Sequence, residues 1–77
     1  MSYEAAQMRF VERLESIRAA KGLTKKNFGK LIGVSGFTYD YYVNKGGMPN
    51  LYTAMVMAER LGLTLDQLLG ITGGKKA

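Results

Sequence analysis

The chain has 77 residues, a mass of 8.5 kDa, 47% hydrophobic residues and a formal charge of +5, which limits it to a single small domain. It contains neither cysteine nor histidine, and this excludes disulfides, thiol or imidazole catalysis and the usual zinc sites. No apolar stretch is long enough for a membrane helix, and no secretion signal is recognisable at the start. We therefore expect a non-enzymatic cytoplasmic protein that needs no cofactor or metal.

The first part of the chain has helical periodicity. Phe10, Leu14 and Ile17 fall on one apolar stripe at 3.6-residue spacing, which predicts a helix over residues 3–20 that ends before Gly22. The residues expected to face away from the core are Glu12, Arg13, Glu15 and Ser16.

Two shorter helices are predicted next. Thr24 is a suitable N-cap for a helix over residues 25–32, which Gly33 ends. Its expected inward residues are Phe28, Leu31 and Ile32. Ser35 is a suitable N-cap for a third helix over residues 36–44. That segment is rich in aromatic and β-branched residues, which favour a strand, but its position between a capping serine and a glycine pair favours a helix.

Two further helices are predicted after the only proline. Asn50 caps a helix over residues 51–61, which Gly62 ends. Thr64 and Gln67 form a capping box that opens a last helix through Leu69. The expected core residues are Leu51, Ala54, Met55, Ala58 and Leu61 in the fourth helix, and Leu65, Leu68 and Leu69 in the fifth.

Positive charge is concentrated in the middle of the sequence. Residues 21–48 contain five lysines and a single acidic residue, Asp40, for a net charge of +4, whereas residues 1–20 are neutral. A basic segment of this kind is typical of a protein that binds a polyanion.

The two helices joined by Gly33-Val34-Ser35 are typical of a helix-turn-helix, whose second helix enters the major groove of DNA. Over residues 10–70 the chain resembles the Cro/repressor-type, or xenobiotic-response-element, helix-turn-helix domain. The matching residues are Leu23-Thr24, Phe28, Leu31 to Ser35, Pro49-Asn50-Leu51 and Leu61 to Leu69. The resemblance implies an all-α fold, a compact five-helix bundle whose second and third helices form the motif. We expect one domain over residues 1–72 and a flexible basic tail over residues 73–77.

The sequence departs from the family pattern at several positions. Gly29 replaces a small alanine in the second helix, and Tyr39 and Tyr42 replace buried aliphatic residues, so that their hydroxyls require an acceptor or water. Val43 stands where an acidic residue is usual, and Lys45 stands where a glycine is usual.

The third helix is expected to present an aromatic face to solvent. At 100° per residue, Phe37, Tyr41 and Asn44 lie opposite Tyr39 and Tyr42. By resemblance, the base-reading positions are Gly36, Phe37, Thr38 and Tyr41. Phe37 can pack on a thymine methyl, so we expect a thymine in each half-site. Asp40 could accept a hydrogen bond from cytosine or repel a phosphate, and the sequence does not distinguish these roles.

Phosphate contacts require only donors and the N-terminal ends of helices. Residues that fit this role lie in the first turn of the second helix, after the third helix and at the start of the fourth. They are Lys25, Lys26, Asn44, Lys45, Asn50 and Tyr52.

The resemblance implies a sequence-specific regulator, a phage or bacterial repressor that binds double-stranded DNA in the bacterial cytoplasm or nucleoid. Since one small domain covers little DNA, we expect a homodimer. Candidate dimer residues are Leu63, Leu65, Ile71 and Val56. No membrane or small-molecule partner is expected. The alternative is a protein-binding adaptor or antitoxin, because exposed aromatic residues also favour protein interfaces.

Overall fold

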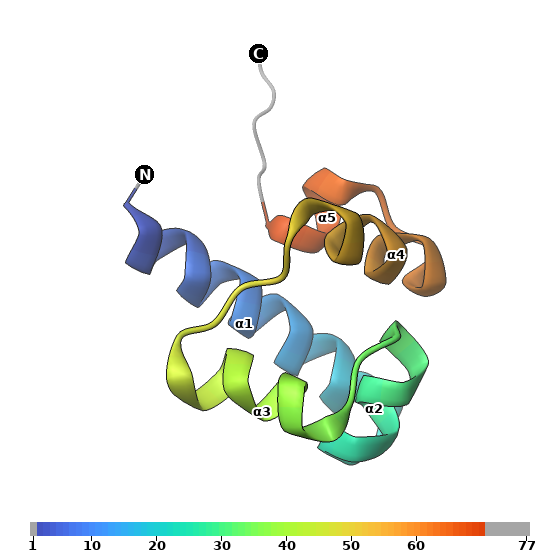
Figure 1. Ribbon diagram of the computed structural model, residues 1–77. Helices are drawn as coiled ribbons and strands as arrows, with labels where there is room; N and C mark the ends of the chain where they lie inside the picture. Colours follow the sequence, from blue (N-terminus) through green and yellow to red (C-terminus); the bar gives the residue numbers. More distant parts are fainter. Residues whose placement is uncertain (1, 71–77) are drawn as a thin grey trace.

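The computed structural model describes residues 2–70, which form an all-α bundle without a strand in that part of the chain (Figure 1). The helices are α1 (Tyr3–Lys21), α2 (Lys25–Ile32), α3 (Gly36–Lys45), α4 (Leu51–Leu61) and α5 (Leu65–Leu69). All five expected helices are therefore present in the expected order. Two are one residue longer than predicted, since α1 includes Lys21 and α3 includes Lys45.

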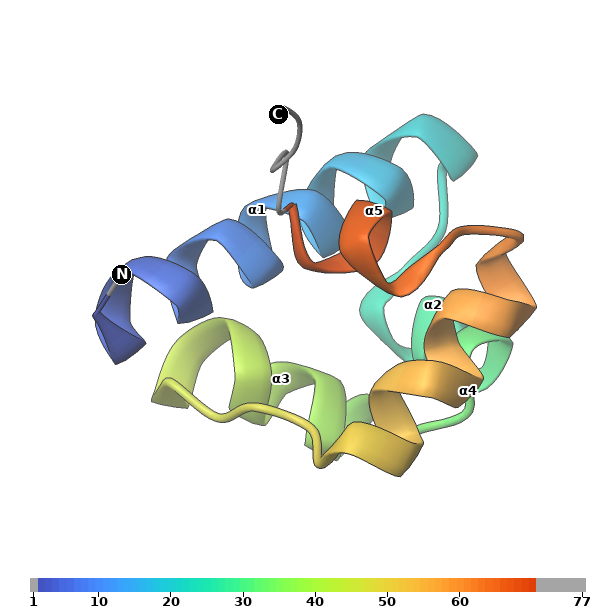
Figure 2. The ribbon, with the colours of Figure 1, turned by 90° about the horizontal axis from the view of Figure 1, so that it is seen from above.

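The longest helix, α1, lies through the middle of the bundle. Helix α3 runs beside it on one side, and α5 returns to it on another (Figures 1 and 2). Helix α2 packs against α3 and α4, and α4 packs against α5. The chain passes from α3 to α4 through an extended connection over residues 46–50.

Each helix begins at a side chain that accepts a hydrogen bond from a backbone amide of its first turn. Thr24, Ser35 and Asn50 cap α2, α3 and α4 as predicted, and Ser2 caps α1. The predicted capping box of α5 is present, with Thr64 and Gln67 each bonding the other's backbone amide. These bonds satisfy amides that have no intrahelical partner.

Ten buried residues from all five helices form the core: Phe10, Leu14, Phe28, Ile32, Tyr39, Tyr42, Ala54, Met57, Ala58 and Leu68. The expected stripe of α4 was partly wrong. Leu51 and Met55 are 67% and 55% exposed, and Met57 is fully buried in their place. The buried face of α4 is centred on Ala54, Ala58 and Met57, and Met55 points about 100° away from it.

The expectation for Leu31 was also wrong, because this side chain is exposed. The buried face of α2 is completed by Gly29 instead. Since Gly29 has no side chain, the turn that leads into α3 lies directly on this part of α2. Leu31 points about 100° away from the centre of this buried face and is 37% exposed.

Glu15 does not face away from the bundle as predicted. Its side chain is half-buried and accepts a hydrogen bond from the hydroxyl of the buried Tyr39 on α3. The predicted tail, residues 73–77, and the dimer candidate Ile71 lie outside the described residues. None of the helices among residues 2–70 is long and apolar enough to cross a membrane.

Candidate nucleic-acid interface

The exposed face of α3 carries two large aromatic side chains. Phe37 is 86% exposed and Tyr41 is 51% exposed. Thr38 and Gly36 at the start of the same helix are half-buried. The predicted outward orientation of Phe37 and Tyr41 is therefore confirmed, and together they present an apolar surface to solvent.

The opposite face of α3 is buried by two other tyrosines. The Tyr39 ring meets the Phe28 ring edge to face at 5.4 Å, and the Tyr42 ring meets the Phe10 ring at 5.7 Å. The Tyr39 hydroxyl donates to a Glu15 carboxylate oxygen at 2.6 Å. Burial raises the pKa of Tyr39, and the hydrogen bond to Glu15 raises it further. Burial also raises the pKa of Tyr42. Both phenols are therefore neutral at physiological pH.

The turn between α2 and α3 is tight. Gly33 has φ +94°, a left-handed conformation that favours glycine, and the amides of Gly33 and Val34 both donate to the Gly29 carbonyl. A side-chain carbon at Gly29 would lie 2.9 Å from the Val34 carbonyl oxygen. The Ser35 hydroxyl then accepts from the Thr38 amide at 3.0 Å and starts α3. The result is two short helices joined by a three-residue turn, the geometry of a helix-turn-helix.

Charged residues flank the exposed face of α3. The Lys25 ammonium lies 3.6 Å from the Asp40 carboxylate, and the Asn44 side chain donates to that carboxylate at 2.6 Å. Lys26 and Lys45 are exposed and make no ion pair with the residues that the structure describes. The predicted phosphate-contacting residues therefore fall into two groups. Lys26 and Lys45 are available to a phosphate, whereas Lys25 and Asn44 already bind Asp40.

The connection from α3 to α4 is held by the start of α1. The Tyr3 hydroxyl donates to the Gly46 carbonyl at 2.7 Å, and the Gln7 amide donates to the carbonyls of Tyr42 and Gly47. Sequence reasoning did not identify Tyr3 or Gln7, because contacts across 35 or more residues leave no periodic signal. The connection ends at Asn50, whose side chain caps α4 by accepting a hydrogen bond from the Thr53 amide.

Residues 14–68 match a protein-family model described as helix-turn-helix, the Cro/repressor type. The chain belongs to this family. The match runs from the middle of α1 to α5 and so includes the whole motif. The helix-turn-helix protein is thus a DNA-binding regulator, and α3 occupies the position of the recognition helix. Searches of curated proteins and of solved structures found no match.

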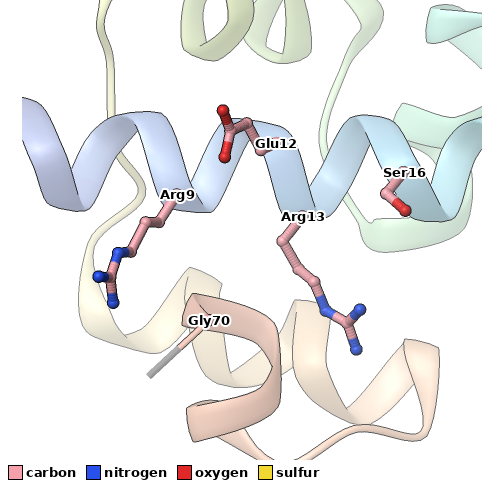
Figure 3. Close-up of a pocket in the computed structure, with 5 residues that line it drawn as sticks. All are labelled: Arg9, Glu12, Arg13, Ser16 and Gly70. Carbon is pink, nitrogen blue, oxygen red and sulfur yellow. The ribbon is translucent and has the colours of Figure 1, made fainter. Parts of the chain in front are cut away.

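The helix-turn-helix protein also has an open depression between α1 and α5, lined by Arg9, Glu12, Arg13, Ser16 and Gly70 (Figure 3). Arg9 and Arg13 extend from α1 in the direction of Gly70, whereas Glu12 points the other way (Figure 3). The Arg13 guanidinium donates to the Gln67 carbonyl at 3.0 Å, near the C-terminal end of α5. Arg13 therefore links α1 to α5 through a hydrogen bond. No group of three potential metal ligands occurs among residues 2–70.

Proposed function

We propose that the protein is a sequence-specific transcriptional repressor of the Cro type, which inserts α3 into the major groove of an operator half-site and so blocks transcription. The observation that carries the proposal is the 86% exposure of Phe37 at the start of α3, on a basic helix-turn-helix. Together with the exposed Tyr41 it forms an apolar surface, and exposed apolar surfaces mark sites of interaction with a partner.

The base-reading residues of the proposal are Gly36, Phe37, Thr38 and Tyr41. Phe37 would pack on a thymine methyl, and Gly36 would let the backbone approach the bases. The Thr38 hydroxyl accepts from Ser35, so its own proton remains available for a base acceptor. No arginine, asparagine or glutamine lies at the start of α3, so thymine contacts would carry most of the selectivity.

The phosphate-contacting residues of the proposal lie on both sides of α3. Lys26 and Lys45 supply free charges, and Lys25 and Asn44 would contribute once they leave Asp40. At the start of α4, Asn50 caps the Thr53 amide and leaves the amides of Leu51 and Tyr52 without an intrahelical acceptor. A helix N-terminus of this kind favours a phosphate.

A selection of binding sites from random duplexes, followed by titration of the selected duplex at several salt concentrations, tests the proposal. Neutralising about four to six phosphates per subunit gives a log–log salt slope of about −3.6 to −5.4 for each subunit. Phe37→Ala should lower affinity for the selected duplex by about tenfold and leave affinity for a scrambled duplex unchanged.

Met8→Ala is the matched control, because Met8 is also an exposed apolar side chain but lies on α1. It should leave both affinities unchanged. A random-duplex selection that enriches no sequence, or equal losses for the selected and the scrambled duplex with Phe37→Ala, would refute base reading by this helix.

The proposed repressor acts as a homodimer. One domain of this size buries only about 600 to 1,000 Å² of its own surface on DNA, which favours a dimer that reads two half-sites about one helical turn apart. Leu63, Leu65 and Val56 are half-buried in the monomer, so each has some surface left for a partner. Sedimentation with and without the selected duplex measures the stoichiometry, and half-site spacing in the selected sequences gives an independent reading.

A protein-binding adaptor or antitoxin is the second candidate. It is favoured by the same exposed aromatic side chains, Phe37 and Tyr41, because aromatic residues dominate the binding energy of protein interfaces. This function predicts weak, sequence-independent DNA binding in the titration. It also predicts that Phe37→Ala changes neither DNA affinity.

A further inference from the structure

Tyr39 of α3 is fully buried, and its hydroxyl forms a hydrogen bond to a different helix, α1. Its ring packs against Phe28, and its hydroxyl donates to Glu15 on α1 at 2.6 Å. Tyr42, the other buried tyrosine of α3, makes no hydroxyl hydrogen bond to residues 2–70. Two hydrogen bonds therefore join α1 to α3 within the described residues: Gln7 binds the Tyr42 carbonyl near the end of α3, and Tyr39–Glu15 is the one formed by a side chain of α3.

The acceptor of this bond is itself fixed. Arg18 binds both carboxylate oxygens of Glu15, at 3.0 and 2.8 Å, and also donates to the Leu23 carbonyl at 2.9 Å. The hydrogen bond from Arg18 holds the pKa of Glu15 below its usual range, so the carboxylate stays charged. Bidentate and charge-assisted bonds are shorter and more directional than neutral ones. The Tyr39–Glu15–Arg18 network thus spans α3, α1 and the connection to α2.

From this geometry we infer that Tyr39 is a positioning residue, whose hydrogen bond to Glu15 fixes the rotation of α3 about its axis and thereby the direction in which Phe37 and Tyr41 project. Both aromatic residues lie two positions from Tyr39, about 200° around the helix. A hydrogen bond weakens steeply when its distance and angle leave the preferred range, so it restricts the rotation of the helix that carries it. At the side-chain radius of about 6 Å, a rotation of 20° displaces an outer atom by about 2 Å.

A displacement of this size matters for base reading, because binding groups must be held within about 0.5 Å and 10–20° of the productive geometry. Nonspecific phosphate contacts through lysines tolerate it. This step of the inference rests on the proposed function. It predicts that loss of the Tyr39 hydroxyl lowers selectivity between duplexes and leaves nonspecific affinity unchanged.

Tyr39→Phe tests the inference, because it keeps the ring and removes only the hydroxyl. Tyr42→Phe is the matched control, a buried tyrosine of the same helix. We expect Tyr39→Phe to reduce the ratio of selected to scrambled duplex affinity by about tenfold, and Tyr42→Phe to leave it unchanged. In the Tyr39→Phe background, Glu15→Gln should cost no further selectivity, since the two side chains act through one bond.

The placement of α3 is also tested in the free protein. The NMR signals of Phe37 and Tyr41 report a change in orientation, and amide hydrogen exchange reports how readily the helix opens. Tyr39→Phe should reduce protection across α3 and shift these signals, and Tyr42→Phe should do neither. Equal behaviour of the two variants in the free protein overturns the inference, as does unchanged duplex selectivity. If the unmodified protein selects no duplex while the α3 signals respond as expected, the proposed function fails and the positioning role of Tyr39 stands.

Discussion

The Lys25 ammonium lies 3.6 Å from a carboxylate oxygen of Asp40, and the same oxygen accepts a 2.6 Å hydrogen bond from the Asn44 side chain. Lys25 is in the first turn of α2, and Asp40 and Asn44 are on α3. Two donors proposed for phosphate contacts therefore share one acceptor within the protein. The side chains of Lys25 and Asp40 are 41% and 46% exposed, so the pair contributes less than about 1 kcal/mol to stability.

Asp40→Asn should strengthen DNA binding. The substitution removes a negative charge beside the proposed recognition face and frees Lys25 for a phosphate, which adds about 0.9 to the magnitude of the log–log salt slope. The free energy of unfolding should change by less than about 0.5 kcal/mol. Titration of the selected duplex at several salt concentrations measures the slope, and urea unfolding measures the stability.

Asp66→Asn is the matched control for Asp40→Asn, because it makes the same change in net charge on α5, which packs against α1 and α4 rather than the motif. Asp66→Asn should raise DNA affinity less than Asp40→Asn does, and it should leave the log–log salt slope unchanged. If both substitutions have equal effects, the role of Asp40 is limited to net charge.

Gly29→Ala should destabilise the protein even though alanine is the better helix former. The added carbon would lie 2.9 Å from the Val34 carbonyl oxygen and 3.1 Å from that of Ser35. Both are backbone atoms of the turn and cannot move without shifting α3. We expect a loss of about 1 to 3 kcal/mol in the free energy of unfolding, against a gain of about 1 kcal/mol from helix propensity.

Asn27→Ala separates these two effects, because Asn27 is an exposed residue of the same helix. There only propensity changes, and the variant should be more stable by about 0.5 kcal/mol. Urea unfolding measures the free energy of unfolding of both variants. If Gly29→Ala is more stable than the unmodified protein, the backbone of Val34 and Ser35 can move to accommodate the added carbon.

The stability of the protein should depend on pH through Glu15. Its hydrogen bonds from Arg18 and Tyr39 lower the pKa of the carboxyl below the ordinary value of 4.5. A lowered pKa in the folded state stabilises the protein above the unfolded-state pKa, and the contribution is lost as the pH falls through the folded-state value. Glu15→Gln lacks this contribution.

The measurement is urea unfolding of the unmodified protein and Glu15→Gln at a series of pH values. We expect the unmodified protein to be more stable by about 1 to 2 kcal/mol near neutral pH, with the difference shrinking below about pH 5. Glu12→Gln removes the same charge from an exposed position of α1 and controls for net charge. A difference that stays constant down to about pH 3 would contradict the role of the Glu15 charge.

The helices could be predicted from sequence because the residues that begin and end each helix lie close to it in the chain. Thr24, Ser35 and Asn50 each cap the helix that follows, and such capping requires only a few neighbouring residues. The outward projection of Phe37 also followed from spacing within one helix.

The rotation of α4 could not be predicted in the same way. Seven of its first eight residues are apolar, including both Met55 and Met57, so periodicity does not distinguish one face from another. Burial there is decided by α5 and α2, which pack on α4. Glu15 was misplaced for a related reason, since its partner Tyr39 lies 24 residues away on another helix.

Gly47→Ala should disturb the proposed recognition face directly. Gly47 is buried, its amide donates to the Tyr41 carbonyl at 3.2 Å, and a side-chain carbon at this position would overlap the Tyr41 ring. We expect a loss of about 1 to 3 kcal/mol in the free energy of unfolding as the ring is displaced. In the Tyr41→Ala background the ring is absent and this loss should largely disappear, which a double-mutant cycle by urea unfolding measures.

Gly46→Ala is the control for Gly47→Ala. Gly46 has φ +74° and nothing within 4 Å of an added carbon, so its substitution costs about 1 kcal/mol from the left-handed backbone alone. That cost should be equal with and without the Tyr41 ring. If Gly47→Ala also costs the same in both backgrounds, contact with Gly47 does not position Tyr41, and the exposed face of α3 does not depend on the connection to α4.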